Sequence, residues 1–151
     1  MQTYQAVETS EVIVKDNDTL RVLVVEDSPI VAERLKEALR EIRAVRVTDI
    51  IDRENKAVDA IARGGIDIVV LDLRLNRGTG FGVLRALATG EGERPIVIIF
   101  TNYDLPEYRR QALALGADYF LDKARDFERL PEIIETIRDQ RQPPGLVPSF
   151  T

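Results

Sequence analysis

The stretch "DIVVLDLRLNRGTG" (residues 67–80) decides the fold, because it carries a short apolar run directly into a carboxylate and a glycine-containing loop. Four consecutive apolar residues (68–71) are typical of a strand that is buried on both faces, as in a parallel sheet. Asp72 follows at once, and burying a charge without a partner costs several kcal/mol. We therefore expect a buried parallel strand here and a functional reason for its terminal acid.

Apolar runs of the same kind recur on both sides of this stretch. The five runs span residues 20–25, 45–50, 66–71, 95–100 and 118–121. Amphipathic segments with helical spacing follow them, at residues 29–42, 53–65, 81–90, 105–116 and 129–140. This alternation predicts a doubly wound α/β fold, in which five helices cover both faces of a five-stranded parallel sheet.

The composition limits the chemistry that the chain can perform. Its 151 residues fit one domain with a single core, and a net charge of -5 argues against a general electrostatic attraction to nucleic acid. Cysteine and histidine are absent, which excludes disulfides, thiolate or imidazole metal ligands and histidine catalysis. Any metal ion must therefore be held by oxygen.

The two ends of the chain are expected to lie outside the core domain, which we place at residues 20–140. Residues 1–19 form an N-terminal extension, in which "EVIVK" (11–15) leaves open an extra edge strand or a partner-binding arm. Residues 141–151 form a proline-rich tail. The chain has neither a signal-peptide pattern nor an apolar run of membrane-spanning length, so we expect a cytoplasmic protein with no membrane contact.

Polar residues follow the predicted strands where ligands bind in open α/β sheets, beyond the carboxyl ends. These residues are Glu26 and Asp27 after the first strand, Asp72 after the third, Thr101 after the fourth and Lys123 after the fifth. Three carboxylates, a hydroxyl and an ammonium group should therefore meet at one edge of the sheet.

Such a cluster of carboxylates requires compensation. At about 4 Å and an effective dielectric constant of about 20, each pair costs about 4 kcal/mol. Either the pKa values rise or a cation lies among the acids, and Mg²⁺ suits a site made of a few oxygen ligands and water. A carboxylate, a divalent cation, a lysine and a hydroxyl can together accept a phosphoryl group, with the already anionic Asp72 as nucleophile.

Four segments of the chain resemble the receiver domain of two-component response regulators. They are "LVVEDSPIV" (23–31), "IVVLDLRLNRGTGFGVL" (68–84), "VIIFTNY" (97–103) and "LGADYFLDK" (115–123). The segments occur in the family's order, and the resemblance extends over about residues 20–140. The resemblance implies a flavodoxin-like fold with strand order 2-1-3-4-5, which places the acids at the topological switch point.

The resemblance also implies the roles of the acidic residues. Asp72 corresponds to the phosphoacceptor and Asp27 to a direct Mg²⁺ ligand. Glu26 corresponds to the acidic neighbour that acts on the metal through water. The backbone carbonyl of Arg74 corresponds to the third protein ligand of the metal.

Three further residues match the family's switching machinery. Lys123 corresponds to the ion partner of the acceptor, Thr101 to the hydroxyl that moves to the phosphoryl oxygen, and Phe120 to the aromatic residue that turns inward on activation. An aromatic residue in a short strand is also commonly a plain core residue. Ala124 stands where the family usually has a proline, so we expect a trans peptide bond after the lysine.

The function that the resemblance implies is a stand-alone phospho-accepting receiver, unless the chain is a fragment of a longer protein. A histidine kinase or phosphotransfer protein would donate the phosphoryl group to Asp72 in a Mg²⁺-dependent reaction. The modified receiver would then switch a partner-binding surface formed by the fourth helix, the fifth strand and the fifth helix. The resemblance leaves the downstream protein unidentified, and it leaves open a homodimer through this surface.

The chain is not expected to be an enzyme, although slow autodephosphorylation is left open. Three alternative functions compete with this interpretation. A Mg²⁺-dependent aspartyl phosphatase would have a second acid two residues after the nucleophile, where this chain has Arg74. A docking pseudo-receiver would leave Asp72 unmodified, and a flavin-binding protein would have a Ser/Thr/Gly-rich phosphate loop after the first strand.

Overall fold

The structure of the protein, a computed structural model, describes residues 18–141. The predictions for residues 1–17 and 142–151, including an edge strand at 11–15, lie outside the described residues. Among the described helices, none is both long enough and apolar enough to cross a membrane.

Within residues 18–141, the sheet has five parallel strands in the expected order. The strands are β1 (Leu20–Val25), β2 (Val45–Ile51), β3 (Ile68–Leu71), β4 (Ile96–Thr101) and β5 (Tyr119–Asp122). They lie side by side in the order β2-β1-β3-β4-β5, and each neighbouring pair is parallel. All four residues of β3 are buried, as the apolar run predicts, whereas the edge strand β2 is partly exposed.

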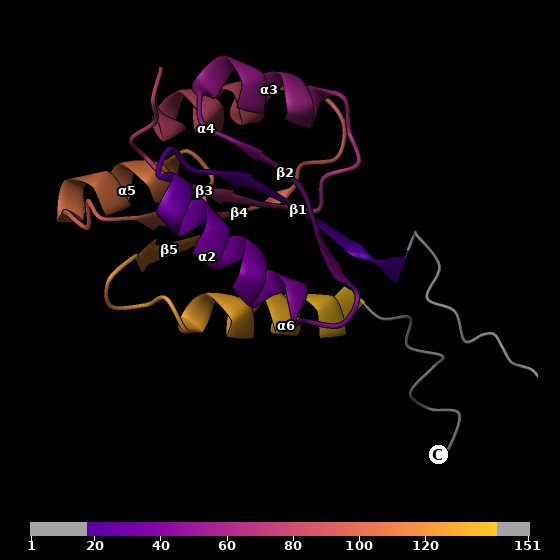
Figure 1. The fold of residues 1–151 in the computed structure, drawn as a ribbon. Helices are drawn as coiled ribbons and strands as arrows, with labels where there is room; N and C mark the ends of the chain where they lie inside the picture. Colours follow the sequence, from indigo (N-terminus) through magenta and orange to yellow (C-terminus); the bar gives the residue numbers. More distant parts are fainter. Residues whose placement is uncertain (1–17, 142–151) are drawn as a thin grey trace, which may run out of the picture.

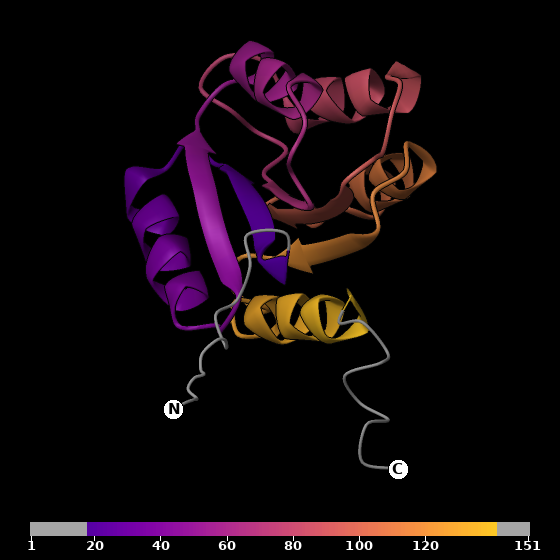
Figure 2. The same cartoon turned by 90° about the vertical axis from the view of Figure 1, so that its right-hand side faces the viewer.

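The five helices of the described residues cover the two faces of the sheet (Figure 1, Figure 2). They are α2 (Pro29–Arg40), α3 (Glu54–Ala62), α4 (Gly80–Thr89), α5 (Pro106–Ala114) and α6 (Arg129–Arg141). α2 and α6 pack on one face of the sheet, and α3, α4 and α5 pack on the other. The doubly wound, flavodoxin-like architecture is therefore confirmed.

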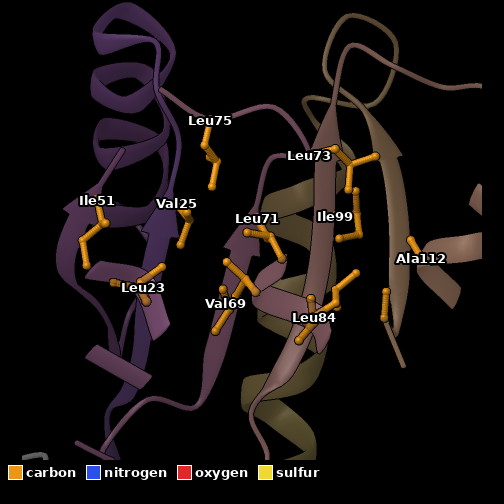
Figure 3. Packing of buried hydrophobic residues seen from close by; sticks show 14 of the residues in the cluster. Leu23, Val25, Ile51, Val69, Leu71, Leu73, Leu75, Leu84, Ile99 and Ala112 are labelled. Atoms are coloured by element: carbon orange, nitrogen blue, oxygen red, sulfur yellow. The ribbon is translucent and has the colours of Figure 1, made fainter. Parts of the chain in front are cut away.

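Two apolar clusters form the core, because side chains alternate between the two faces along each strand. The cluster under α3, α4 and α5 includes Leu23, Val69, Leu71 and Ile99 (Figure 3). The cluster under α2 and α6 is built from the intervening strand residues, such as Val22, Val24, Ile68 and Phe100. Burial on both faces explains why the central strands are almost entirely apolar.

The helix ends follow the chemistry of their terminal residues. Ser28 is the N-cap of α2, where its hydroxyl accepts a hydrogen bond from the Val31 backbone N–H, and Pro29 is the first helical residue. The predicted helix at 53–65 ends before Gly64 and Gly65, which have φ angles of 85° and 84°. Glycine reaches this left-handed region without steric cost.

Candidate functional site

The polar residues predicted to follow the strands meet at the carboxyl edge of the sheet. Backbone hydrogen bonds between neighbouring chain segments continue past the strand ends and hold the site residues in register. The N–H of Glu26 donates to the Ile51 carbonyl (2.8 Å), that of Asp72 to Val25 (3.0 Å) and that of Lys123 to Thr101 (2.9 Å). The regular sheet therefore positions the backbone of these residues.

The three acids converge as predicted. One carboxylate oxygen from each of Glu26, Asp27 and Asp72 lies within 4.8 Å of the others. Glu26 and Asp72 are buried, with 3% and 4% of their surface exposed, whereas Asp27 is exposed. Two buried acids and one open acid leave the cluster accessible from solvent on one side.

Lys123 lies between the two buried acids. Its Nζ is 2.8 Å from Oδ2 of Asp72, and 2.8 and 2.9 Å from the two carboxylate oxygens of Glu26. The peptide bond after Lys123 is trans, as expected, since no cis bond occurs in the described residues. One ammonium group thus joins the ends of β1, β3 and β5.

Burial and ion pairing compete in this cluster. Burial raises the pKa of Glu26 above its ordinary value, although Lys123 and the Ser28 N–H stabilise the carboxylate. Burial alone would lower the pKa of Lys123, but the hydrogen bonds to Asp72 and Glu26 outweigh it and raise that pKa. Three carboxylates facing one ammonium leave two negative charges, which a divalent cation would neutralise.

The Thr101 side chain is fully buried at the end of β4. Its hydroxyl accepts a hydrogen bond of 3.2 Å from the Tyr103 backbone N–H. Phe120 on the neighbouring strand β5 is buried with 6% exposure, and the Arg109 guanidinium carbon lies 4.7 Å from the centroid of its ring. Phe120 belongs to the core cluster under α3, α4 and α5.

In the loop after Asp72, buried and exposed side chains alternate. Leu73 and Leu75 are buried, and Arg74 between them is exposed. The Arg74 backbone N–H lies 3.4 Å from Oδ1 of Asp72. The guanidinium group of Arg74 donates a hydrogen bond to the Tyr103 hydroxyl. The guanidinium carbon is also 5.3 Å from the Tyr103 ring centroid.

A hollow of about 820 Å³ opens beside the acidic cluster. Its lining includes Glu26 and Asp27, together with Asp49 in β2, Asp52 just after β2 and Lys56 in α3. Asp49 and Asp52 therefore line this hollow and do not belong to the acidic cluster of Glu26, Asp27 and Asp72. Among the three acids, this hollow reaches Glu26 and Asp27.

Sequence reasoning missed Asp126, a third buried acid, which lies four residues after the end of β5. Its carboxylate accepts a hydrogen bond of 2.9 Å from the Asp122 N–H and pairs with Arg125 and Arg129. The bond to the Asp122 N–H, followed by the Arg125 side chain, lowers its pKa against the effect of burial. The only signal in the sequence is an acid four residues after the strand's last residue, which is not specific.

Comparisons with known proteins point to one family. The family model of the response regulator receiver domain matches residues 22–135. The chain is 30% identical over 118 residues to the transcriptional regulatory protein CusR of Escherichia coli (strain K12), covering 78% of this chain and 51% of CusR. It is 28% identical over 123 residues to the sensory transduction protein LytT of Bacillus anthracis, covering 82% and 49%. The chain thus spans about half the length of these relatives.

Solved structures show the same similarity. A LuxR-family two-component response regulator from Aurantimonas sp. SI85-9A1 superimposes with a TM-score of 0.73 at 27% identity, covering 82% of this chain and 87% of that one. The receiver domain of the sensor histidine kinase PA1611 from Pseudomonas aeruginosa PAO1 has a TM-score of 0.70 at 26% identity, covering 80% and 98%. The latter structure has a magnesium ion coordinated in its active-site cleft.

Proposed function

Since this chain belongs to the response regulator receiver family, we propose that Asp72 is the residue through which it performs its phospho-accepting signalling role. The donor would be the phosphohistidine of a histidine kinase or phosphotransfer protein. The observation that carries this assignment is the buried Asp72 carboxylate, which Lys123 holds at 2.8 Å beside two further acids. A carboxylate can act as a nucleophile without a general base, and a cationic partner can orient it.

The donor set fits Mg²⁺. Glu26, Asp27 and Asp72 offer hard carboxylate oxygens within 4.8 Å of one another, and the exposed position of Asp27 leaves room for water ligands. We assign Asp27, Asp72 and the Arg74 carbonyl as direct ligands, with Glu26 acting through water. The ion would neutralise charge on the phosphoryl oxygens during transfer.

The transfer itself is an in-line displacement at phosphorus. An oxygen of the Asp72 carboxylate forms a bond to phosphorus while the phosphorus–nitrogen bond of the phosphohistidine breaks, and the imidazole leaves with the electron pair of that bond. Lys123 already binds Oδ2 of Asp72. The Arg74 N–H lies 3.4 Å from Oδ1, which is long for a hydrogen bond. Lys123 can therefore orient the carboxylate and then stabilise the added negative charge.

The response would begin at Thr101 and Phe120. The Thr101 hydroxyl accepts a hydrogen bond from the Tyr103 N–H, and its own proton can be donated to a phosphoryl oxygen. A phosphoryl group adds about -1.5 to -2 of charge, and such a change acts by biasing a two-state element. Phe120 on β5 pairs with Ile99, two residues before Thr101 on the neighbouring strand β4, and the change would pass through it to the surface of α5, β5 and α6. An unidentified downstream protein, or a second copy of the chain, would bind there.

We place the receiver unit at residues 20–140, in the cytoplasm with its donor, and propose no catalysis by it beyond slow hydrolysis of its own phosphate. The position of Arg74 argues against an aspartyl phosphatase, because the side chain two residues after Asp72 is a guanidinium group bound to Tyr103. An acid would be needed there to protonate a leaving group.

Phosphotransfer from a radiolabelled histidine-phosphorylated donor tests this function. The parent protein should take the label in the presence of Mg²⁺, and Asp72→Ala should not. Asp27→Ala should keep the acceptor but lose most of the Mg²⁺ dependence. Equal labelling of the parent and Asp72→Ala would remove Asp72 from its assigned role.

A further inference from the structure

α4 begins with a cap that is assembled from two separate parts of the chain. Thr79 is the N-cap, and its hydroxyl accepts the Gly82 backbone N–H at 3.1 Å. In a capping box, an acid at the position of Gly82 would reach back to the N–H of the N-cap residue. Here that position has no side chain, and the Thr79 N–H instead donates to Oε1 of Glu54, at the start of α3, at 3.0 Å.

The Glu54 carboxylate occupies the space of the missing side chain. A Cβ atom added to Gly82 would lie 2.2 Å from the Glu54 carboxylate, and one added to Gly78 would lie 2.5 Å from the same side chain. Both glycines therefore leave room for Glu54. A negative charge at the N-terminus of a helix is also stabilised by the helix dipole, and Glu54 lies at the start of both α3 and α4.

This cap is connected directly to the phosphoacceptor. Gly80, the residue after Thr79, packs so closely on Asp72 that a Cβ atom would lie 2.3 Å from the Asp72 carbonyl oxygen. The Gly80 N–H also donates to the Leu73 carbonyl at 2.9 Å. A displacement of Thr79 would therefore be passed to the backbone of Asp72.

The segment that contains Glu54 also holds the middle of the acceptor loop. The Asn76 N–H donates to the Asp52 carbonyl at 3.0 Å, and the Asn76 side-chain amide reaches the Asp52 carboxylate at 3.2 Å. The Glu54 N–H donates to the Arg77 carbonyl at 2.9 Å. The Arg74 backbone thus lies in a loop whose middle and end are both fixed by residues 52–54.

We propose that Glu54 is a positioning residue for the phosphoacceptor. Its carboxylate completes the cap of α4 from α3, and it thereby fixes the loop from Asp72 to Thr79, including the Arg74 carbonyl, for Mg²⁺ binding and phosphoryl transfer. The inference rests on the proposed function, because it assigns Glu54 a task only if Asp72 accepts the phosphoryl group.

Restoring the cap within α4 tests this role. The variants are Glu54→Ala, Glu54→Gln, and Glu54→Ala combined with either Gly82→Glu or Gly82→Lys. Glu107→Ala is the matched control, because Glu107 is an exposed acid in the first turn of α5. For each protein, titration calorimetry gives the Kd for Mg²⁺, hydrogen exchange gives the protection of the Thr79 amide, and urea unfolding gives the stability. Acetyl phosphate gives the rate of Asp72 labelling.

Glu54→Ala should weaken Mg²⁺ binding about tenfold, because loss of a residue that orients metal ligands typically has an effect of this size. It should also speed hydrogen exchange at the Thr79 amide. Gly82→Glu should restore both quantities in the Glu54→Ala background, whereas Gly82→Lys should restore neither. Glu54→Gln keeps an acceptor oxygen and should stay close to the parent, as should Glu107→Ala.

The outcomes separate this inference from the function on which it depends. If the parent neither binds Mg²⁺ nor takes the phosphoryl group, the proposed function fails and the role of Glu54 fails with it. If the parent does both and Glu54→Ala changes only the stability, the positioning role alone is wrong. Equal rescue by Gly82→Glu and Gly82→Lys would also overturn it, because helix propensity would then explain the effect.

Discussion

Lys123 Nζ lies 2.8 Å from Oδ2 of Asp72, although the two residues are 51 positions apart in the sequence. The same ammonium group binds Glu26, so that one cation joins the ends of three strands. Because both acids are buried, the lysine supports the fold as well as the proposed chemistry.

Replacing Lys123 with methionine should destabilise the protein in the absence of divalent cations. Removing one member of a buried ion pair typically costs about 3 to 5 kcal/mol, because the remaining charge has no partner. Urea unfolding in the presence of a chelator measures this loss, and Mg²⁺ should recover part of it. A Lys123→Met protein as stable as the parent under these conditions would show that the ion pairs are unimportant.

Thr101→Ala should separate phosphorylation from switching. Asp72 and Lys123 remain in place, so labelling by acetyl phosphate should continue, but the hydroxyl that bonds the phosphoryl oxygen is lost. Nuclear magnetic resonance shifts induced by beryllofluoride in α5 and β5 should become smaller, and Thr101→Ser should retain them. Unchanged shifts in Thr101→Ala would exclude Thr101 as the switch.

Arg74 and Tyr103 should control the lifetime of the phosphate. Arg74 lies two residues after Asp72 and Tyr103 two residues after Thr101, and a hydrogen bond joins their side chains. We expect this pair to limit the access of water to the phosphoryl group. Arg74→Ala should therefore shorten the half-life of the labelled protein, and Tyr103→Phe, which leaves the aromatic ring in place, should shorten it less. A longer half-life in Arg74→Ala would mean that the pair assists hydrolysis.

The sheet and the acidic cluster could be predicted because both depend on local patterns. The apolar run before Asp72 predicts a buried strand, and the parallel arrangement carries Asp27, Asp72 and Lys123 to one edge without further information. Ser28 and Pro29 likewise determine the start of α2 through local backbone chemistry.

Contacts between distant loops could not be predicted in this way. The bond from the Thr79 N–H to Glu54 joins residues 25 positions apart, and neither residue type is unusual at its position. The burial of Asp126 depends on how the turn after β5 folds back on the Asp122 N–H. Such pairs follow from the packed geometry of two loops, for which the sequence has no periodic signal.

Asp126 should make the free energy of unfolding depend on pH under acidic conditions. Its pKa is lowered from the ordinary value of 3.8, so the carboxylate stabilises the folded state fully above that value. The contribution is lost as the pH falls through the lower pKa of the folded protein. The difference in unfolding free energy between the parent and Asp126→Asn should be constant near neutral pH and should shrink below pH 3.8.

The contribution of Glu26 has the opposite sign. Because the pKa of Glu26 is raised in the folded state, its contribution to the free energy of unfolding is lost as the pH rises through that pKa. Glu26 is present in both proteins, so its contribution cancels in the difference. A difference that stays constant down to the lowest accessible pH would contradict the lowered pKa of Asp126.

The most direct test of the central claim is to locate the phosphoryl group chemically. The protein is incubated with acetyl phosphate and Mg²⁺, the acyl phosphate is reduced with borohydride, and the modified residue is identified by tandem mass spectrometry. We expect homoserine at position 72 alone, with no modification when Mg²⁺ is chelated or when Asp72 is replaced by asparagine. A reduced residue at another position, or its absence in a folded parent protein with Mg²⁺ present, would contradict the account.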